Sequence, residues 1–181
     1  MDMFMEVIKG RRSIRKYEDK EISQEQLDIL LEAVRWSPSW ANTQCWEIVV
    51  ARSAETKAAL QAALPPKGNP AFKAMTAAPV VLVICGKKGT SGFYKGATTT
   101  VLGDWFMYDL GIATQTLCLT AHAMGLGTVV VGLFDHAKAA EAVGVPEGYQ
   151  LVSMIPVGFP AKTGSAPKRR KPGEYVHLER F

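Results

Sequence analysis

The chain has 181 residues, 48% of them hydrophobic and 21% charged, which is typical of one folded domain with a substantial core rather than a disordered chain. The formal net charge is +4, and the cations concentrate in two short runs, at residues 11–16 and 168–171. A broad nucleic-acid-binding face needs a longer basic stripe, so we expect no nucleic-acid partner.

The first half of the chain predicts two helices separated by a short strand. Its N-terminal residues lack a basic segment followed by an apolar run and predict no signal peptide. Residues 22–39 predict a helix, because Ser23 can cap its start, Gln26 completes a capping box and its apolar residues form one stripe. "WEIVVA" at residues 46–51 then predicts a strand, and residues 53–64 predict a second amphipathic helix.

The second half alternates strands with helices. "APVVLVICG" at residues 78–86 is a continuous apolar run and predicts a buried central strand. The helix predicted at residues 104–124 is apolar nearly all round, so we expect it in the middle of the fold; its polar residues suit a core helix better than a membrane span. Two further strands, at residues 127–134 and 150–160, flank a short helix near residues 136–144.

This alternation predicts one layered domain of sheet and helices over residues 1–181. Residues 164–181 are rich in Gly, Pro and Lys and have too little apolar periodicity to fold alone, so we expect them to form a C-terminal arm. With neither a targeting signal nor a membrane span in view, the expected location is the cytoplasm.

The run "RRSIRKYED" at residues 11–19 concentrates cations and a hydroxyl near the N-terminus. Arg11, Ser13 and Arg15 alternate, so in an extended segment their side chains point the same way. A guanidinium binds phosphate oxygens through paired hydrogen bonds, and a hydroxyl adds another. The run predicts either a solvated charged surface, the commoner use of such runs, or a cradle for one phosphorylated ligand.

A second polar cluster, "SPSWANTQCW" at residues 37–46, follows the first long helix. Asn42 and Gln44 carry amides that donate and accept hydrogen bonds, which suits the edge of a heteroaromatic ring. The alternative interpretation is a polar loop of ordinary turn residues, and the residues alone leave both open.

Other catalytic signatures do not fit. "GLGTVVVG" at residues 125–132 precedes a predicted strand, whereas the glycine-rich dinucleotide fingerprint follows one. No serine stands in a G-x-S-x-G motif. The histidines have no metal-ligand spacing, and the cysteines have no C-x-x-C pair and predict small buried side chains, so we expect no metal site and no disulfide framework. These residues are His122, His136, His177, Cys45, Cys85 and Cys118.

Four blocks occur in order along nearly the whole chain: "RRSIRKY", "SPSWANTQCWEIVV", "GLGTVVVGLF", and "PVGFP" with "KRRKP". Each is weak alone, but their ordered combination resembles the nitroreductase family of FMN-dependent oxidoreductases. The resemblance implies an α+β fold with a central mixed sheet flanked by helices. It also implies an intertwined homodimer with one FMN at each end of the dimer interface, touching both subunits.

The same resemblance assigns FMN-binding roles to the four blocks. It implies that Arg11, Arg12 and Ser13 hold the phosphate and ribityl chain, with Arg15 near the N1 and O2 edge of the ring. The second block implies a loop that lies against the flavin and comes from the other subunit. The third block implies strand-end backbone beside the ring. The fourth block implies a C-terminal pair of cations that closes on the phosphate. The residues of these three blocks are Pro38, Ser39, Trp40, Asn42, Gln44, Val131, Gly132, Leu133, Lys168 and Arg170.

The chain departs from the family pattern near the ring. Trp40 stands where the family often has a small residue, and Cys45 stands where a proline usually lies. The chain is too short for the long helical insertion that shapes the substrate channel in larger members. We therefore expect an open site, or one shaped by residues 65–73 and 89–96.

The resemblance implies that hydride passes from NADH or NADPH through FMN to a small acceptor, such as a nitroaromatic or a quinone, in a ping-pong sequence without a side-chain base. A guanidinium at Arg15 would favour the reduced flavin, which is anionic at N1. The alternatives are a same-fold enzyme that fragments flavin or removes halogen, and a non-catalytic flavin-binding protein. Turnover of NAD(P)H would distinguish a non-catalytic flavin-binding protein from the enzymes.

Overall fold

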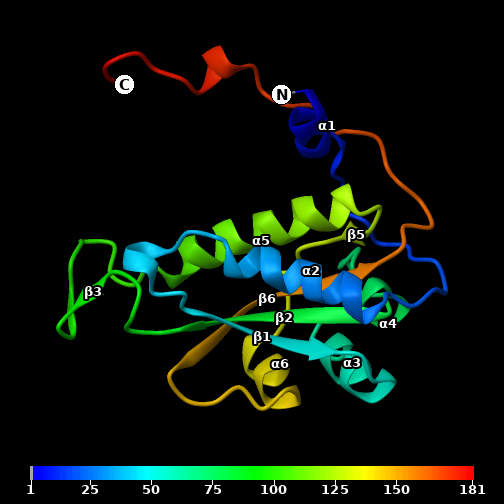
Figure 1. The fold of residues 1–181 in the computed structure, drawn as a ribbon. Helices are drawn as coiled ribbons and strands as arrows, with labels where there is room; N and C mark the ends of the chain where they lie inside the picture. The colour runs from blue at the N-terminus through cyan, green and yellow to red at the C-terminus, as the bar shows by residue number, and fades with distance from the viewer. Residues whose placement is uncertain (1) are drawn as a thin grey trace.

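The computed structural model describes residues 2–181 and shows a central sheet with helices on both faces (Figure 1). The sheet has the strand order β1-β2-β6-β5, and its named strands all pair antiparallel. An isolated parallel bridge joins Ser13 to Thr128 at the β5 edge, which makes the sheet mixed. The strands are β1 Trp46–Ala51, β2 Val80–Lys87, β5 Gly127–Thr128 and β6 Tyr149–Gly158, and β3 Phe93–Tyr94 and β4 Ala97–Thr98 form a separate hairpin.

The helices α2 and α5 cover one face of the sheet, and α3, α4 and α6 cover the other (Figure 1). The first helix, α1, contacts α5 on the side away from the sheet. This arrangement confirms the predicted α+β class. The helices are α1 Asp2–Gly10, α2 Gln24–Arg35, α3 Ala54–Gln61, α4 Ala74–Ala77, α5 Phe106–Ala123 and α6 His136–Ala142.

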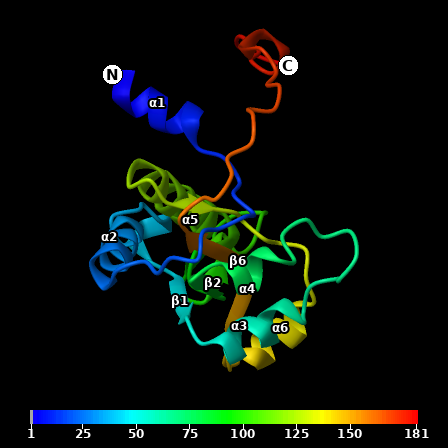
Figure 2. The same ribbon diagram turned by 90° about the vertical axis from the view of Figure 1, so that its right-hand side faces the viewer.

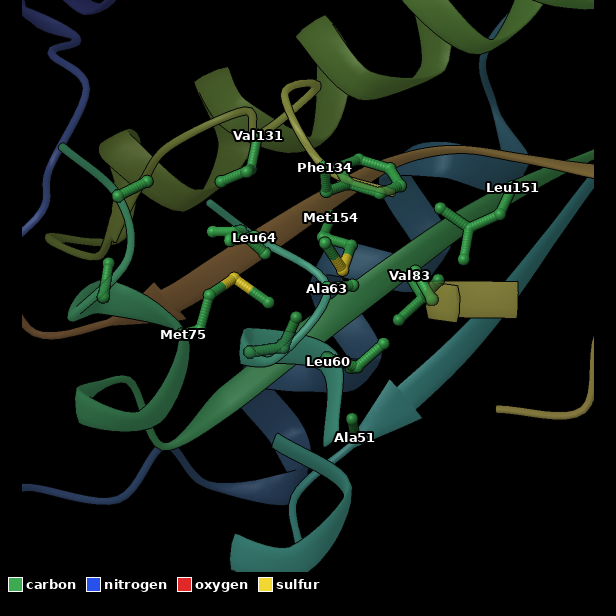
Figure 3. Packing of buried hydrophobic residues seen from close by; sticks show 14 of the residues in the cluster. Ala51, Leu60, Ala63, Leu64, Met75, Val83, Val131, Phe134, Leu151 and Met154 are labelled. Atoms are coloured by element: carbon green, nitrogen blue, oxygen red, sulfur yellow. The ribbon is translucent and has the colours of Figure 1, made fainter. Parts of the chain in front are cut away.

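The central strand β2 is apolar without interruption because both of its faces are buried. Its alternate residues from Val80 to Ile84 pack against α2 and α5. The residues between them, from Val81 to Cys85, pack with Met154 of β6 against α3, α4 and α6, as Figure 3 shows. The prediction of a buried central strand is thereby confirmed.

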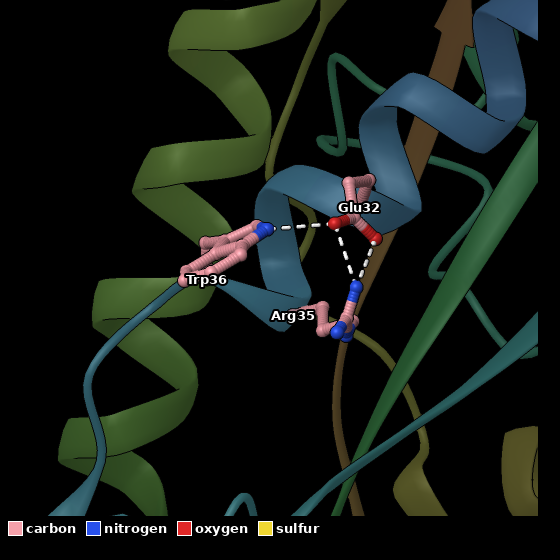
Figure 4. A network of polar contacts seen from close by, with 3 residues as sticks. All are labelled: Glu32, Arg35 and Trp36. Atoms are coloured by element: carbon pink, nitrogen blue, oxygen red, sulfur yellow. Dashed lines mark hydrogen bonds and ion pairs between the residues drawn. The ribbon is translucent and has the colours of Figure 1, made fainter.

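Side-chain contacts define both ends of α2. Ser23 Oγ accepts the backbone N–H of Gln26 at 3.1 Å, and Gln26 Oε1 accepts that of Ser23 at 3.0 Å, which confirms the capping box. At the other end, Glu32 accepts hydrogen bonds from Arg35 at 2.8 Å and from Trp36 Nε1 at 2.6 Å (Figure 4). These hydrogen bonds, with that from Arg35 the stronger influence, lower the pKa of the Glu32 carboxyl. The helix thus ends just before the polar loop at residue 37.

One predicted element is shorter than expected, and one helix was not predicted. The strand predicted at residues 127–134 is shorter: only Gly127 and Thr128 pair as β5, and Val131 rejoins β6 through one bridge to Met154. This segment lies at the edge of the sheet and pairs as a strand only with β6, so the ladder of hydrogen bonds between them is easily interrupted. The N-terminal residues, for which the sequence predicted no element, form α1, which has no buried residue of its own.

The helix α5 is not in the middle of the fold within one chain. Leu110 and Leu117 are buried against the sheet and α2, but Met107 and Tyr108 are 56% and 63% exposed. The helix is apolar all round because its outer side also carries apolar residues, which the single chain leaves uncovered. Within residues 2–181, no helix combines the length and hydropathy needed to cross a bilayer.

Residues 161–181 are exposed along their whole length and leave the body as an extended segment with one 3-10 turn, Pro172–Glu174. Both chain ends lie on the same side of the molecule, beyond α5 (Figures 1 and 2). The arm at residues 164–181 follows β6 after five residues, and its first residues line a cavity together with the basic run that follows α1.

Candidate functional site

The basic run that follows α1 is held in place by backbone contacts at the sheet edge. The Ile14 N–H donates to the Thr128 carbonyl at 2.8 Å, and Ile14 itself is buried. The Tyr17 hydroxyl lies 2.8 Å from the Ile14 carbonyl and 3.0 Å from the Pro156 carbonyl. Because Ile14 points inward, Ser13 and Arg15 on either side of it point outward.

A cavity of about 320 Å³ joins this run to the start of the arm. Its lining includes four residues that were predicted to bind one ligand. Residues from Gly164 to Arg169 of the arm form the other side of the cavity. Arg169, rather than the predicted Lys168 and Arg170, supplies the arm's cation to the lining. The guanidinium of Arg170 lies 5.4 Å from the ring centre of Tyr175 instead. The four residues from the run are Arg11, Arg12, Ser13 and Arg15.

The side chain of Arg12 has a buried donor without an acceptor. Its Nη1 donates to the carbonyls of Lys9 at 2.5 Å and Arg11 at 2.8 Å, whereas its Nε is buried and has no hydrogen-bond partner. Buried guanidinium donors are nearly always paired, so an unpaired one beside a cluster of cations indicates an anion site. The donors present here fit a phosphate group.

The polar loop that follows α2 has a strained backbone. Ala41, Asn42 and Gln44 all have positive φ, at 44°, 56° and 47°. Such conformations cost roughly 1–3 kcal/mol each for residues other than glycine and tend to cluster at functional sites. The Gln44 N–H donates to Ser39 Oγ at 2.9 Å, and the side chains of Asn42 and Gln44 stay exposed. Gln44 Nε2 donates to Asn42 Oδ1 at 3.3 Å, and this exposed pair of amides can meet a ligand.

A buried carboxylate, Asp109 of α5, anchors this loop. It accepts hydrogen bonds from the Trp40 N–H at 3.0 Å, from Ser91 Oγ at 2.5 Å and from Cys45 Sγ at 3.5 Å. Burial first, and then the charge of Asp109, raises the pKa of the Cys45 thiol to about 12. The sequence signal for Asp109 was a lone carboxylate in an apolar helix, since such a group must find donors when it is buried.

Aromatic side chains gather beside the anchored loop. The ring centres of Trp40 and Trp105 lie 5.0 Å apart, and Trp105 and Tyr108 lie 5.4 Å apart in an edge-on arrangement. With Pro38 and Ser39 they line a cavity of about 220 Å³. Trp105 and Tyr108 were not among the predicted site residues, because nothing in the linear order links them to the loop.

The two halves of the predicted site lie at opposite ends of α5. The aromatic cavity is lined by its N-terminal residues, Tyr108 among them, and the basic run lies near its C-terminal residue His122. A helix of 18 residues is about 27 Å long. One chain therefore does not bring the basic run and the polar loop together.

Of the third predicted block, Val131, Gly132 and Leu133 line neither of these two cavities. Val131 is buried in the sheet, whereas Leu133 is 64% exposed, and Gly132 connects them. The Leu133 carbonyl accepts a hydrogen bond from Asn69 Nδ2 at 2.9 Å, so the segment at residues 65–73 flanks this block. Throughout residues 2–181, no three His, Cys, Asp or Glu side chains are grouped to hold a metal ion.

Comparison with known proteins assigns the chain to a family. The model of the nitroreductase family matches residues 8–159. The FMN reductase [NAD(P)H] of Bacillus subtilis is 32% identical, over 97% of this chain and 74% of its own length. The 5,6-dimethylbenzimidazole synthase of Rhodospirillum rubrum is 25% identical, over 90% of this chain and 84% of its own.

A solved structure agrees with these sequence matches. The FMN-dependent nitroreductase of Clostridium difficile R20291 superimposes with a TM-score of 0.81 at 27% identity, covering 98% of this chain and 99% of that one. The matched residues include three of the four blocks and most of the sheet and helices described above. This chain belongs to the nitroreductase family.

Proposed function

We propose that the protein is an FMN-dependent NAD(P)H oxidoreductase in which the electron donor and a small acceptor, such as a nitroaromatic or a quinone, bind in turn. The observation that carries this proposal is the cavity that Arg11, Arg12, Ser13 and Arg15 line together with Arg169, which is remote from them in sequence. The names of the relatives and of the structural neighbour support FMN and NAD(P)H as the cofactor and the donor. When bound, FMN supplies the hydride and electron transfer chemistry.

The residues of the cavity suit the phosphate end of FMN. Arg11, Arg12 and Arg169 present guanidinium groups that can pair with phosphate oxygens, and Ser13 adds a hydroxyl. Arg15, at the outer end of the same row, would place a positive charge at the edge of the ring that becomes more negative on reduction. The two basic runs then serve one ligand and need no nucleic acid to account for them.

The polar loop suits the ring end. The amides of Asn42 and Gln44 are exposed and can bond to the polar edge of the flavin, and Asp109 holds the loop backbone in its strained conformation. Trp40 and Trp105 would border the acceptor. The loop thus positions the ring and the acceptor without contributing a side-chain acid or base.

A second copy of the chain would complete the site. The phosphate half and the ring half lie at opposite ends of α5, so an antiparallel pair of chains would bring the loop of each to the basic run of the other. Large apolar side chains stay exposed on α1, on the outer side of α5 and in the arm, and such surfaces mark interfaces. They include Phe4 at 65%, Met107 at 56%, Leu178 at 85% and Phe181 at 106%. We therefore propose an intertwined homodimer with two FMN sites.

One alternative activity rests on a specific comparison. The Rhodospirillum rubrum relative is named 5,6-dimethylbenzimidazole synthase, which indicates that a protein similar over most of this chain makes a benzimidazole. Supplying reduced FMN in air and measuring loss of the flavin itself would separate flavin breakdown from transfer to an acceptor.

The absorption spectrum of the purified protein tests the main proposal. We expect a yellow protein with one FMN per chain, whose visible absorption is bleached by NADH or NADPH without oxygen and restored by a quinone. A colourless protein that takes up no flavin when FMN is supplied would refute the proposal. A yellow protein that neither donor reduces would instead indicate a non-catalytic flavin-binding protein.

A further inference from the structure

A second cavity, of about 150 Å³, adjoins the phosphate cavity and shares Arg11 and Arg12 with it. It lies where α1, the end of α5, β5 and the beginning of the arm come together. Among the described residues that line it, Arg11, Arg12 and His122 are the titratable ones, and no carboxylate is present. The lining therefore carries positive charge without a counter-ion of its own, which suits a bound anion.

His122 lines this cavity from α5. It stands in the last turn of α5 and is partly buried. Its imidazole packs so closely on Gly10 that a Cβ at that position would lie 2.6 Å from Nε2. Because Gly10 has no side chain, the imidazole can contact the backbone directly before Arg11.

The positive charges of Arg11 and Arg12 link the protonation of His122 to the binding of an anion at these arginines. Burial first, and then the positive charges of Arg11 and Arg12, lower the pKa of His122 from the ordinary value of about 6.5. One turn earlier on α5, burial raises the pKa of the Cys118 thiol, and a hydrogen bond with Thr128 and the charge of Arg11 partly offset this rise. An anion on the two arginines would offset their repulsion, and the partial negative charge at the C-terminal end of α5 favours a cation in that turn.

We propose that His122, which lines the adjoining cavity together with Arg11 and Arg12, takes up a proton when the phosphate of FMN binds to these two arginines. This inference rests on the proposed FMN function. Because the imidazolium form favours the complex, the pKa of His122 is higher with FMN than without it. The added affinity is complete below the pKa of the free protein and is lost as the pH rises through the pKa of the complex.

Proton NMR of the imidazole groups tests the proposal directly. The chain has three histidines, so in protein without a histidine tag the C2–H signal of His122 is the one lost in His122→Gln. We expect its titration midpoint to rise by roughly one pH unit when FMN is added, which corresponds to about a tenfold change in affinity. Riboflavin, which lacks the phosphate, should leave the midpoint unchanged. An equal midpoint with and without FMN would overturn the proposal.

Binding affinity gives an independent measure. The second pKa of a phosphate monoester is near 6, so FMN itself titrates, but equally for every variant. The informative quantity is the FMN affinity of the wild type relative to His122→Gln, which should fall severalfold, up to about tenfold, between pH 5 and pH 8. His136→Gln is the matched control, since His136 lies on α6, bonded to the Leu151 carbonyl at 2.9 Å, on the other face of the sheet, and it should follow the wild type.

The possible failures are distinguishable. FMN binding with a ratio that does not change with pH would overturn the role of His122 and leave the oxidoreductase proposal intact. No binding of FMN at any pH would overturn both. If His122→Gln does not fold, the His122 signal is still identified in the wild type as the one that persists in both His136→Gln and His177→Gln, so the midpoint remains decisive.

Discussion

At the residue scale, Arg11 and Arg15 stand in the same extended segment and are expected to serve different ends of FMN. Arg11→Ala should mainly weaken FMN retention, since a lost charge-assisted phosphate contact costs roughly 1.5–3 kcal/mol, about ten- to a hundredfold in affinity. Arg15→Ala should lower the reduction potential of bound FMN and slow its reduction even when FMN is saturating. Flavin titration and redox titration measure the two effects.

Arg52→Ala provides the control for both variants. Arg52 is an exposed arginine before α3 that bonds Gln24 at 3.5 Å, away from the cavity, so its loss should change neither quantity. If Arg15→Ala released flavin but reduced normally once reloaded, Arg15 would belong to the phosphate end and our assignment would be wrong.

The cysteine residues should be chemically silent in the folded protein. All three are buried; burial, followed by the charge of Glu47, raises the pKa of Cys85 to about 11, and that of Cys45 is raised to about 12. At pH 8 the reactive thiolate is therefore scarce. We expect a thiol reagent such as dithionitrobenzoate to label almost nothing at pH 8 and to label all three after unfolding.

An exposed Lys162→Cys variant should add one rapidly labelled thiol and so shows that the reagent works on the folded chain. Fast labelling of the unmodified protein would mean that the loop around Cys45 opens in solution. The prediction that the cysteines are small buried side chains is confirmed by their exposures of 4%, 3% and 2%.

At the scale of elements, β5 and the basic run are joined by a close approach that requires glycine. A Cβ at Gly127 would lie 2.6–2.9 Å from three atoms of the Ile14 side chain, including its Cβ, which cannot move without the backbone. Gly127→Ala should therefore cost about 1–3 kcal/mol of stability, as overpacked sites do, and displace the neighbouring Ser13 from the cavity. Urea unfolding and FMN titration measure the two consequences.

Gly173→Ala is the matched control, since a Cβ at Gly173 meets no atom within 4 Å, and its effect should stay within about 0.5 kcal/mol. A Gly127→Ala protein with wild-type stability and FMN affinity would show that the run does not depend on this contact. Beside this contact, Thr128 of β5 accepts the Ile14 N–H and pairs with Ser13, so β5 also holds the basic run through its backbone.

At the scale of the whole molecule, the separation of the two half-sites along α5 predicts that two chains share each FMN. Mixing an Arg11→Ala chain with an Asn42→Ala, Gln44→Ala chain tests this. If each site combines the run of one subunit with the loop of the other, a mixed dimer has one site with neither defect. Random exchange of equal amounts should then restore about a quarter of the FMN sites.

Each variant alone is the control and should bind FMN poorly. No recovery in dimers shown to have exchanged would place both halves of the site in one chain. Sedimentation should give a dimer at micromolar concentration, and a stable flavin-loaded monomer would contradict the shared site.

The sequence by itself determined the elements whose residues act locally. The capping box of α2 depends on residues three apart, and the apolar run of β2 reports burial on both faces, so both could be predicted without the fold. The order of the four blocks was enough to indicate the family. The grouping of Arg11, Ser13 and Arg15 was also local, because alternation in an extended segment turns these side chains the same way, whereas the place of Arg12 beside them depended on the fold.

Only the tertiary structure decided which distant residues meet. Asp109 anchors the Trp40 loop across 69 positions, and Arg169 rather than Lys168 or Arg170 reaches the basic cavity. His122 approaches Arg11 because α5 ends beside the glycine that closes α1. Such contacts depend on how helices pack across the sheet, which local periodicity does not encode. The exposed side of α5 illustrates the same point: the sequence predicted its apolar residues, but only the fold showed that Met107 and Tyr108 stay exposed in the single chain.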